Sequence, residues 1–185
     1  MALTPSSMLP LGTIAPTFNL LDPRTKEWVD LASHKGTLAT VIIFMCNHCP
    51  YVKHIQQGIA DLGQDYHSDA IRLIAINAND ASKYHSDSPE HMIEFAEQLN
   101  FVFPYLYDET QETAQAYHAA CTPDCYIFDS ELLCVYRGQF DESRPGNSVP
   151  VTGHCLREML EAIKHDQPLP TAKQKPSLGC NIKWK

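Results

Sequence analysis

Two cysteines separated by two residues, Cys46 and Cys49, stand between an apolar segment and an amphipathic one. Residues 38–44 are apolar and rich in β-branched side chains, too short to cross a membrane and typical of a buried strand. From Val52 onward, apolar side chains recur every three or four residues, which predicts a helix with one buried face. Pro50 fits the first turn of this helix, where a missing N–H costs no hydrogen bond.

This position favours a reactive thiol. The N-terminus of a helix carries unpaired N–H groups and partial positive charge, which stabilise a thiolate, and a protonated His48 would add to that effect. In such settings the pKa of a thiol falls to between about 3.5 and 7.5. We expect Cys46 to be the exposed nucleophile and Cys49 to resolve a mixed disulfide. Half of a zinc site or two unreactive core thiols are the alternatives. Because a second ligand pair at similar spacing is absent from the sequence, we expect no metal.

Composition narrows the classes of partner and compartment. The chain has 185 residues, a length typical of one domain, and a net charge of −8 without a basic cluster, which argues against nucleic acid and anionic membranes. Residues 1–10 lack the pattern of a signal peptide, and no apolar run reaches membrane length, so we expect a cytoplasmic protein. An odd number of cysteines in such a protein argues against a structural disulfide framework: they are Cys46, Cys49, Cys121, Cys125, Cys134, Cys155 and Cys180.

The sequence predicts alternating strands and helices around this motif. Two short extended pieces within residues 11–35, joined by a turn at Asp22-Pro23, predict a hairpin at one edge of a sheet. An apolar strand at residues 71–77 follows the cysteine helix, and this order predicts a parallel pair of strands with a right-handed crossover.

The second half of the chain predicts three helices and a further hairpin. Ser88 is expected to cap a helix that ends near Leu99, and Thr152 to cap the last helix. The remaining segments are an extended connector at 101–106, a helix from Asp108 or Thr110 to Tyr117, a strand at 125–129 with its hairpin partner at 132–137, and a loop at 140–151. We expect an N-terminal tail at 1–10, a core domain at 11–165, and a tail at 166–185 whose apolar end packs on the domain.

Taken together, these motifs resemble a known group of proteins. The strand, Cys-x-x-Cys motif and helix, followed by Thr122-Pro123 and a hairpin, resemble the thioredoxin fold. Residues 15–18 and their hairpin look like the peroxiredoxin branch, the AhpC/TSA group. More narrowly, the chain resembles the peroxiredoxin-like thioredoxin-family proteins over nearly its whole length, through residues 46–53, 108–111, 121–124, 136–138, 144–147 and 179–184. The resemblance implies an α/β fold with a central mixed sheet flanked by helices.

The resemblance also implies roles for individual residues. Thr122-Pro123 matches the threonine and cis-proline beside which thioredoxins bind a substrate strand. Cys49 matches the peroxidatic cysteine of peroxiredoxins, whereas Cys46 falls where those enzymes keep a threonine. His48 resembles the histidine of disulfide-forming oxidases, which implies a relatively oxidising couple. The arginine of the peroxiredoxins would be supplied by Arg137 or Arg144, between which the sequence does not choose.

Two of the other cysteines are candidates for a role at the site, and three are expected to be core residues. Cys121 adjoins the Thr-Pro pair and is either a third redox partner or metal ligand, or a buried small side chain. Cys180 lies in the apolar tail, where it either resolves an oxidised cysteine, as in some peroxiredoxins, or only packs. Cys125, Cys134 and Cys155 are expected to be core residues.

Three hypotheses of function follow. The first is a thiol–disulfide oxidoreductase in which Cys46 and Cys49 exchange a disulfide with a protein or small molecule, supporting an antioxidant role in cell redox homeostasis. The second is a thiol-dependent peroxidase with Cys49 peroxidatic and Cys46 or Cys180 resolving. The third is a carrier of Cu(I) or zinc. No bound cofactor is expected; a separate protein would supply the thiol reductant, and the sequence does not predict an oligomeric state.

Overall fold

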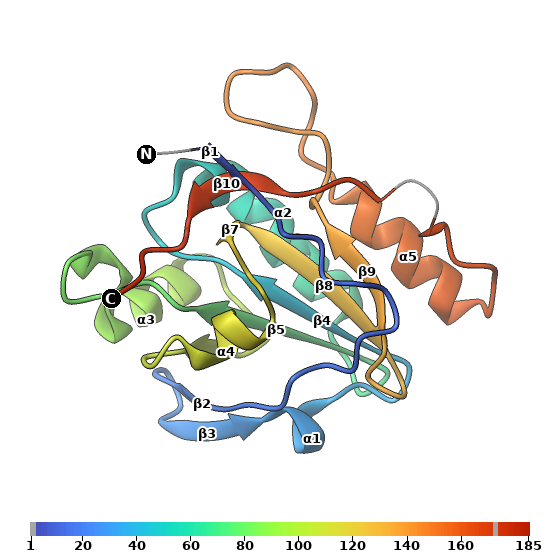
Figure 1. Cartoon of the computed structure of the whole chain (residues 1–185), viewed down its shortest axis with the longest axis horizontal. Helices are drawn as coiled ribbons and strands as arrows, with labels where there is room; N and C mark the ends of the chain where they lie inside the picture. The colour runs from blue at the N-terminus through green and yellow to red at the C-terminus, as the bar shows by residue number, and fades with distance from the viewer. Residues whose placement is uncertain (1–2, 172–173) are drawn as a thin grey trace.

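The computed structural model describes residues 3–171 and 174–185, and within them a mixed sheet forms the centre of the molecule (Figure 1). Its strand order is β3-β2-β6-β5-β4-β8-β9, with β4, β5 and β6 parallel to one another and the other pairs antiparallel. The strands are β2 (Asn19–Asp22), β3 (Glu27–Asp30), β4 (Ala39–Phe44), β5 (Ile71–Asn77), β6 (Tyr105–Tyr107), β8 (Asp124–Asp129) and β9 (Cys134–Gly138). The expected central mixed sheet is therefore confirmed.

Helices cover both faces of this sheet. Because successive side chains of a strand point to opposite faces, Val41 and Ile43 of β4 contribute to one apolar cluster, and Ile42 and Phe44 to another. The first cluster includes residues of α2 (Pro50–Tyr66), α3 (Pro89–Gln98) and α5 (His154–Lys164). The second includes residues of α1 (Leu31–His34) and α4 (Glu112–Ala116). Both faces of β4 are buried, which places its C-terminal end in the interior.

The predicted edge hairpin is confirmed, but the connector before α4 is more ordered than expected. Strands β2 and β3 pair antiparallel at one edge of the sheet. The connector expected at 101–106 ends in a strand, β6, which spans residues 105–107 and pairs with both β5 and β2. The apolar residues of this segment are buried on both sides, and for that reason its pattern does not alternate.

The helix starts differ from the prediction because carboxylates 6 to 12 positions earlier in the chain accept hydrogen bonds from the first turns of two of them. The N-cap of α5 is Gly153 rather than Thr152, and the Asp141 carboxylate accepts hydrogen bonds from the backbone N–H groups of both residues at 2.8 Å. Helix α4 begins at Glu112, since Asp108 still pairs with β5 through its backbone and its carboxylate accepts from the N–H of Ala114. Ser88 occupies the N-cap of α3 without a side-chain capping bond.

A second, smaller sheet joins the two ends of the described chain. Strand β10 (Leu178–Asn181) lies between β1 (Leu3–Pro5) and β7 (Cys121–Thr122) and is antiparallel to both. Figure 1 shows β10 in red crossing over the region where α2 begins. The segments at 3–5 and 178–181, which the sequence analysis assigned to separate tails, thus form one sheet with the segment before Pro123. Among the described residues, no helix is long and apolar enough to cross a membrane.

Candidate active site

The C-terminal end of β4 carries the Cys-x-x-Cys motif into the interior. Met45 continues the strand by donating a backbone hydrogen bond to Ile76, and Cys49 is the N-cap of α2, with Pro50 in the first turn. This local arrangement agrees with the predicted strand, motif and helix. The expected exposure of Cys46 is wrong, however, because its exposed fraction is 1%, and that of Cys49 is 0%.

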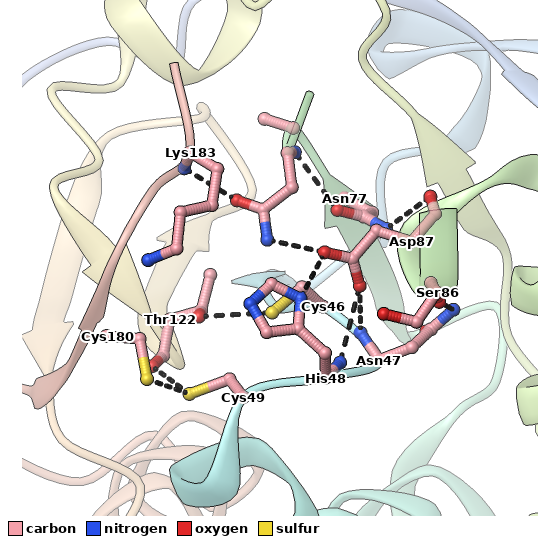
Figure 2. A network of polar contacts seen from close by, with 12 residues as sticks. Cys46, Asn47, His48, Cys49, Asn77, Ser86, Asp87, Thr122, Cys180 and Lys183 are labelled. Carbon is pink, nitrogen blue, oxygen red and sulfur yellow. Dashed lines mark hydrogen bonds and ion pairs between the residues drawn. The ribbon is translucent and has the colours of Figure 1, made fainter. Parts of the chain in front are cut away.

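Three thiols and a threonine meet below strand β10 (Figure 2). The Sγ atoms of Cys49 and Cys180 are 3.0 Å apart, although 131 positions separate the two residues in the sequence. The Sγ of Cys49 also lies 3.2 Å from the carbonyl oxygen of Thr122, and the Sγ of Cys46 lies 3.4 Å from the hydroxyl oxygen of the same residue. Strand pairing places Cys180 directly opposite Thr122. The Thr122–Pro123 peptide bond is cis, as the resemblance implied.

Hydrogen bonds lower the pKa of one of the three thiols, and burial raises the pKa of the other two. A hydrogen bond from the Cys46 thiol is the largest cause that lowers the pKa of Cys49, to about 4, and a hydrogen bond from Cys180 adds to it. Burial raises the pKa of Cys46 well above its ordinary value, and the negative charge of Asp87 contributes to this rise. Burial also raises the pKa of Cys180, to about 12. These pKa shifts favour the thiolate at Cys49 over Cys46 and Cys180.

His48 is held by a buried carboxylate that the sequence analysis did not identify. Asp87 ends the 3-10 helix η1 (His85–Asp87), and its Oδ2 lies 2.5 Å from the Nδ1 of His48. The same carboxylate accepts hydrogen bonds from the backbone N–H groups of Asn47 and His48 and from the side-chain amide of Asn79, at 2.8 to 3.3 Å. The imidazole also stacks on Tyr84, with ring centroids 5.2 Å apart. His48 is thus fixed in position from two sides.

The two arginines are used mainly for structure. Arg144 donates to the carbonyl oxygens of Asp141 and Ser143 and to the side chain of Gln139. Arg137 donates to the side chain of Gln174. Arg144 also lines a small hollow together with Pro123.

The remaining cysteines are distributed as follows. Cys121 is buried beside Thr122, and its Sγ lies 3.7 Å from the carbonyl oxygen of Pro123. Cys125 and Cys134 are core residues, as expected. Cys155 differs from the expectation, since it is only partly buried and contacts His154.

One group of side chains at this site has the composition of a metal site. Cys46, His48 and Asp87 each offer a ligand atom, and the three atoms lie within 4.8 Å of one another. The Asp87 carboxylate, however, already accepts four hydrogen bonds. It has little remaining capacity for a cation, so the group is better described as a hydrogen-bonded histidine–carboxylate pair beside a thiol.

Comparison with known proteins identifies the family. A model of the AhpC/TSA family matches residues 11–137, more than half of the chain. The chain belongs to the AhpC/TSA family. An uncharacterised conserved protein from Geobacillus kaustophilus is 54% identical, with 100% of this chain and 97% of that chain covered and a TM-score of 0.97. A hypothetical protein from Sinorhizobium meliloti 1021 is 39% identical, with 98% of each chain covered and a TM-score of 0.94.

A more distant structure supports the fold of this AhpC/TSA protein. A domain described as a possible thiol-disulfide isomerase, from Cytophaga hutchinsonii, is 15% identical and has a TM-score of 0.62, with 87% of this chain and 97% of that chain covered. At this identity the likeness shows the thioredoxin-like fold alone. No curated protein matches the sequence. Family and fold together support a thioredoxin-like redox function.

The low pKa of Cys49 predicts how the protein responds to acid. This pKa is about 4 in the folded chain, whereas an ordinary thiol, as in the unfolded chain, has a pKa of about 8.5. The ionised Cys49 therefore makes its full contribution to the free energy of unfolding above about pH 8.5. That contribution is lost as the pH falls to about 4. We expect one thiolate, measured by its ultraviolet absorbance, to persist to about pH 4 and to be missing in Cys49→Ser. A first thiolate that forms only near pH 8.5 would contradict this assignment.

Proposed function

We propose that this AhpC/TSA protein is a thiol–disulfide oxidoreductase in which Cys49 is the nucleophile and Cys180 or Cys46 supplies the second thiol. The observation that carries the proposal is the position of the Cys49 sulfur, which is 3.0 Å from that of Cys180, together with the pKa of Cys49, which its neighbouring thiols lower to about 4. A disulfide bond is about 2.05 Å long, so a shift of about 1 Å joins these two sulfurs. These roles reverse the order expected from the sequence, in which Cys46 attacked.

The proposed reaction has two exchange steps. In the first, the Cys49 thiolate attacks one sulfur of an external disulfide; that S–S bond breaks, and the leaving thiolate takes up a proton. In the second, Cys180 or Cys46 loses its proton and attacks the Cys49 sulfur of the mixed disulfide, which releases the other half of the substrate as a thiol. The substrate gains two electrons, and the protein holds one internal disulfide until a separate thiol reductant returns it to the dithiol form.

The ease of the first step follows from the arrangement of hydrogen bonds. Cys46 and Cys180 stabilise the Cys49 thiolate while remaining protonated themselves. Once Cys49 is in a mixed disulfide, it no longer carries the charge that raises the pKa of Cys180. The second thiol therefore becomes easier to ionise at the stage at which it has to attack.

Strand β10 restricts which substrates reach Cys49. It pairs with the backbone of Thr122, the position where a thioredoxin binds a substrate strand, and a Cβ atom on Gly179 would lie 2.0 Å from the carbonyl oxygen of that residue. The neighbouring hollow, lined by Pro123 and Leu178, has a volume of about 10 Å³, close to the minimum for one water molecule. We infer that a protein disulfide reacts only after β10 moves, whereas a small disulfide requires a smaller opening.

Peroxide reduction is the second candidate, and the low pKa of Cys49 favours it. The thiolate would attack a peroxide oxygen, the O–O bond would break, and an alcohol or water would leave after protonation. Cys180 would then attack the resulting sulfenic acid and release water. We rank this reaction second because the described contacts of Arg137 and Arg144 are with other groups, as described above.

The proposed function includes a cytoplasmic location and a separate thiol reductant. An odd number of cysteines, seven, suits the reducing cytoplasm better than a structural disulfide framework. In such a compartment a glutathione- or thioredoxin-type reductant would regenerate the dithiol.

The two candidate reactions are separated by rapid mixing of the reduced protein with hydrogen peroxide and, separately, with a small aryl disulfide. We expect fast reaction with the disulfide, slow reaction with peroxide, and a Cys49–Cys180 or Cys46–Cys49 disulfide identified by peptide mass mapping. Fast consumption of peroxide and slow disulfide exchange would instead establish the peroxidase. Slow reaction with both would exclude both candidates.

A further inference from the structure

A second group of chemically active side chains lies at the N-terminus of α5, apart from the thiols described above. Nε2 of His154 is 3.0 Å from Oε2 of Glu142 and 3.5 Å from Sγ of Cys155. The three side chains each offer a ligand atom, and these atoms lie within 4.8 Å of one another. Glu142 and His154 are partly open to solvent, with side-chain exposed fractions of 39% and 52%.

The backbone that carries these residues is fixed by a buried carboxylate. Asp141 is fully buried and accepts hydrogen bonds from the N–H groups of Ser143, Thr152 and Gly153 at 2.8 to 2.9 Å. It therefore ties the segment that contains Glu142 to the first turn of α5, which contains His154 and Cys155. The hydrogen bonds to Asp141, and not the contacts of the three side chains alone, therefore hold the ligand atoms close together.

A single linear hydrogen bond does not engage both neighbours of Nε2. A neutral imidazole nitrogen carries either a hydrogen or a lone pair, so it either donates to Glu142 or accepts from the Cys155 thiol. A metal ion satisfies all three atoms at once. Zn–S and Zn–N bonds of about 2.3 and 2.0 Å at a tetrahedral angle put sulfur and nitrogen roughly 3.5 Å apart. The separation between Cys155 and His154 has this value.

We propose that Glu142, His154 and Cys155 form a binding site for a divalent cation of the zinc type. One sulfur, one nitrogen and one oxygen ligand suit Zn²⁺, and a thiolate with a carboxylate balances its charge. The exposed side of His154 leaves the fourth coordination position open to water or to a further ligand.

Each proposed ligand also has an outer partner of the kind that supports metal sites. The side-chain amide of Gln139 lies 3.5 Å from Sγ of Cys155, and the hydroxyl of Thr152 lies 3.5 Å from Nδ1 of His154. Lys175 lies 3.2 Å from the second carboxylate oxygen of Glu142. Such partners orient the ligands and tune their basicity, and their loss typically lowers affinity by about 10 to 100-fold.

The test is a Zn²⁺ titration against a chromophoric chelator, with Cys46, Cys49 and Cys180 replaced by serine so that the redox thiols do not compete. We expect one Zn²⁺ per chain, and at least roughly 100-fold weaker binding in Cys155→Ser or His154→Gln, since each removes a direct ligand. His165→Gln is the matched control, because this exposed histidine stands at the other end of α5 and pairs with Glu161. It should leave Zn²⁺ binding unchanged.

Co²⁺ gives a second readout that does not depend on activity. Its absorption should show a sulfur-to-metal charge-transfer band that is lost in Cys155→Ser. If the triple variant does not fold, the unaltered reduced protein should bind one more Zn²⁺ than its Cys155→Ser variant. Binding that is absent, or the same with and without Cys155, would overturn the proposal.

Discussion

Cys49→Ser is expected to lower the rate of reaction with a small aryl disulfide by at least about 10³-fold. A serine hydroxyl at this position neither ionises near neutral pH nor forms a disulfide. The two neighbouring thiols do not replace it, because burial keeps the pKa of both Cys46 and Cys180 high. Stopped-flow measurement of the released aryl thiolate gives the rate, and mass spectrometry shows whether a mixed disulfide forms.

Two further serine variants serve as comparisons. Cys134→Ser is the matched control, since this thiol is buried in β9, donates to the carbonyl oxygen of Tyr136, and has no role in the proposed reaction. It should react at the unaltered rate. Cys46→Ser keeps a hydroxyl that donates to Cys49 and should retain the first exchange step. If Cys46→Ser were inactive while Cys49→Ser formed the mixed disulfide, Cys46 would be the nucleophile after all.

Asp87→Ala is expected to lower the free energy of unfolding by about 3 to 5 kcal/mol. The carboxylate is fully buried, and its removal leaves the N–H of Asn47, the N–H of His48 and the amide of Asn79 without their acceptor. Urea denaturation followed by circular dichroism measures the loss. Asp69→Ala is the control, because Asp69 is 91% exposed and its pairing with Arg72 is worth at most about 1 kcal/mol.

The variant Asp87→Asn separates position from charge. It keeps the size of the side chain and one acceptor oxygen but removes the negative charge that helps to raise the pKa of Cys46. We expect the pKa of Cys46 to fall in this variant, while that of Cys49 stays the lowest of the thiols. If the free energy of unfolding of Asp87→Ala were within 1 kcal/mol of that of the unaltered protein, the hydrogen bonds to Asp87 would not contribute to stability.

The sequence was sufficient for the strand, motif and helix around Cys46 because each is encoded locally. Apolar periodicity marks β4 and α2, and Pro50 marks the start of the helix. The edge hairpin was predictable for the same reason. The burial of Cys46 was not predictable, because it depends on what covers the end of β4. The covering strand lies more than 130 positions away.

Asp87 shows the same limit at the level of a single residue. It lies in the polar stretch at residues 77–87, and nothing in the sequence pattern distinguishes it from neighbouring acidic residues. It becomes part of the site only because η1 folds back to the first turn of the motif, 39 positions earlier than Asp87. Asp141, which lies 12 positions before Gly153, likewise fixes the start of α5. Side chains that satisfy remote backbone groups leave no periodic signal.

The pairing of β10 with β7 affects the order in which the site forms while the protein is synthesised on the ribosome. The C-terminal segment contacts the site through Cys180 at Cys49 (Figure 2). It also contacts the site through the N–H of Lys183, which donates to Asn79, whose side-chain amide in turn donates to Asp87. Translation delivers this segment after every strand of the large sheet. A nascent chain can therefore build its Cys-x-x-Cys site before the cover exists. During that interval we expect its dithiol to react with protein disulfides that, in the finished protein, have to wait for β10 to move.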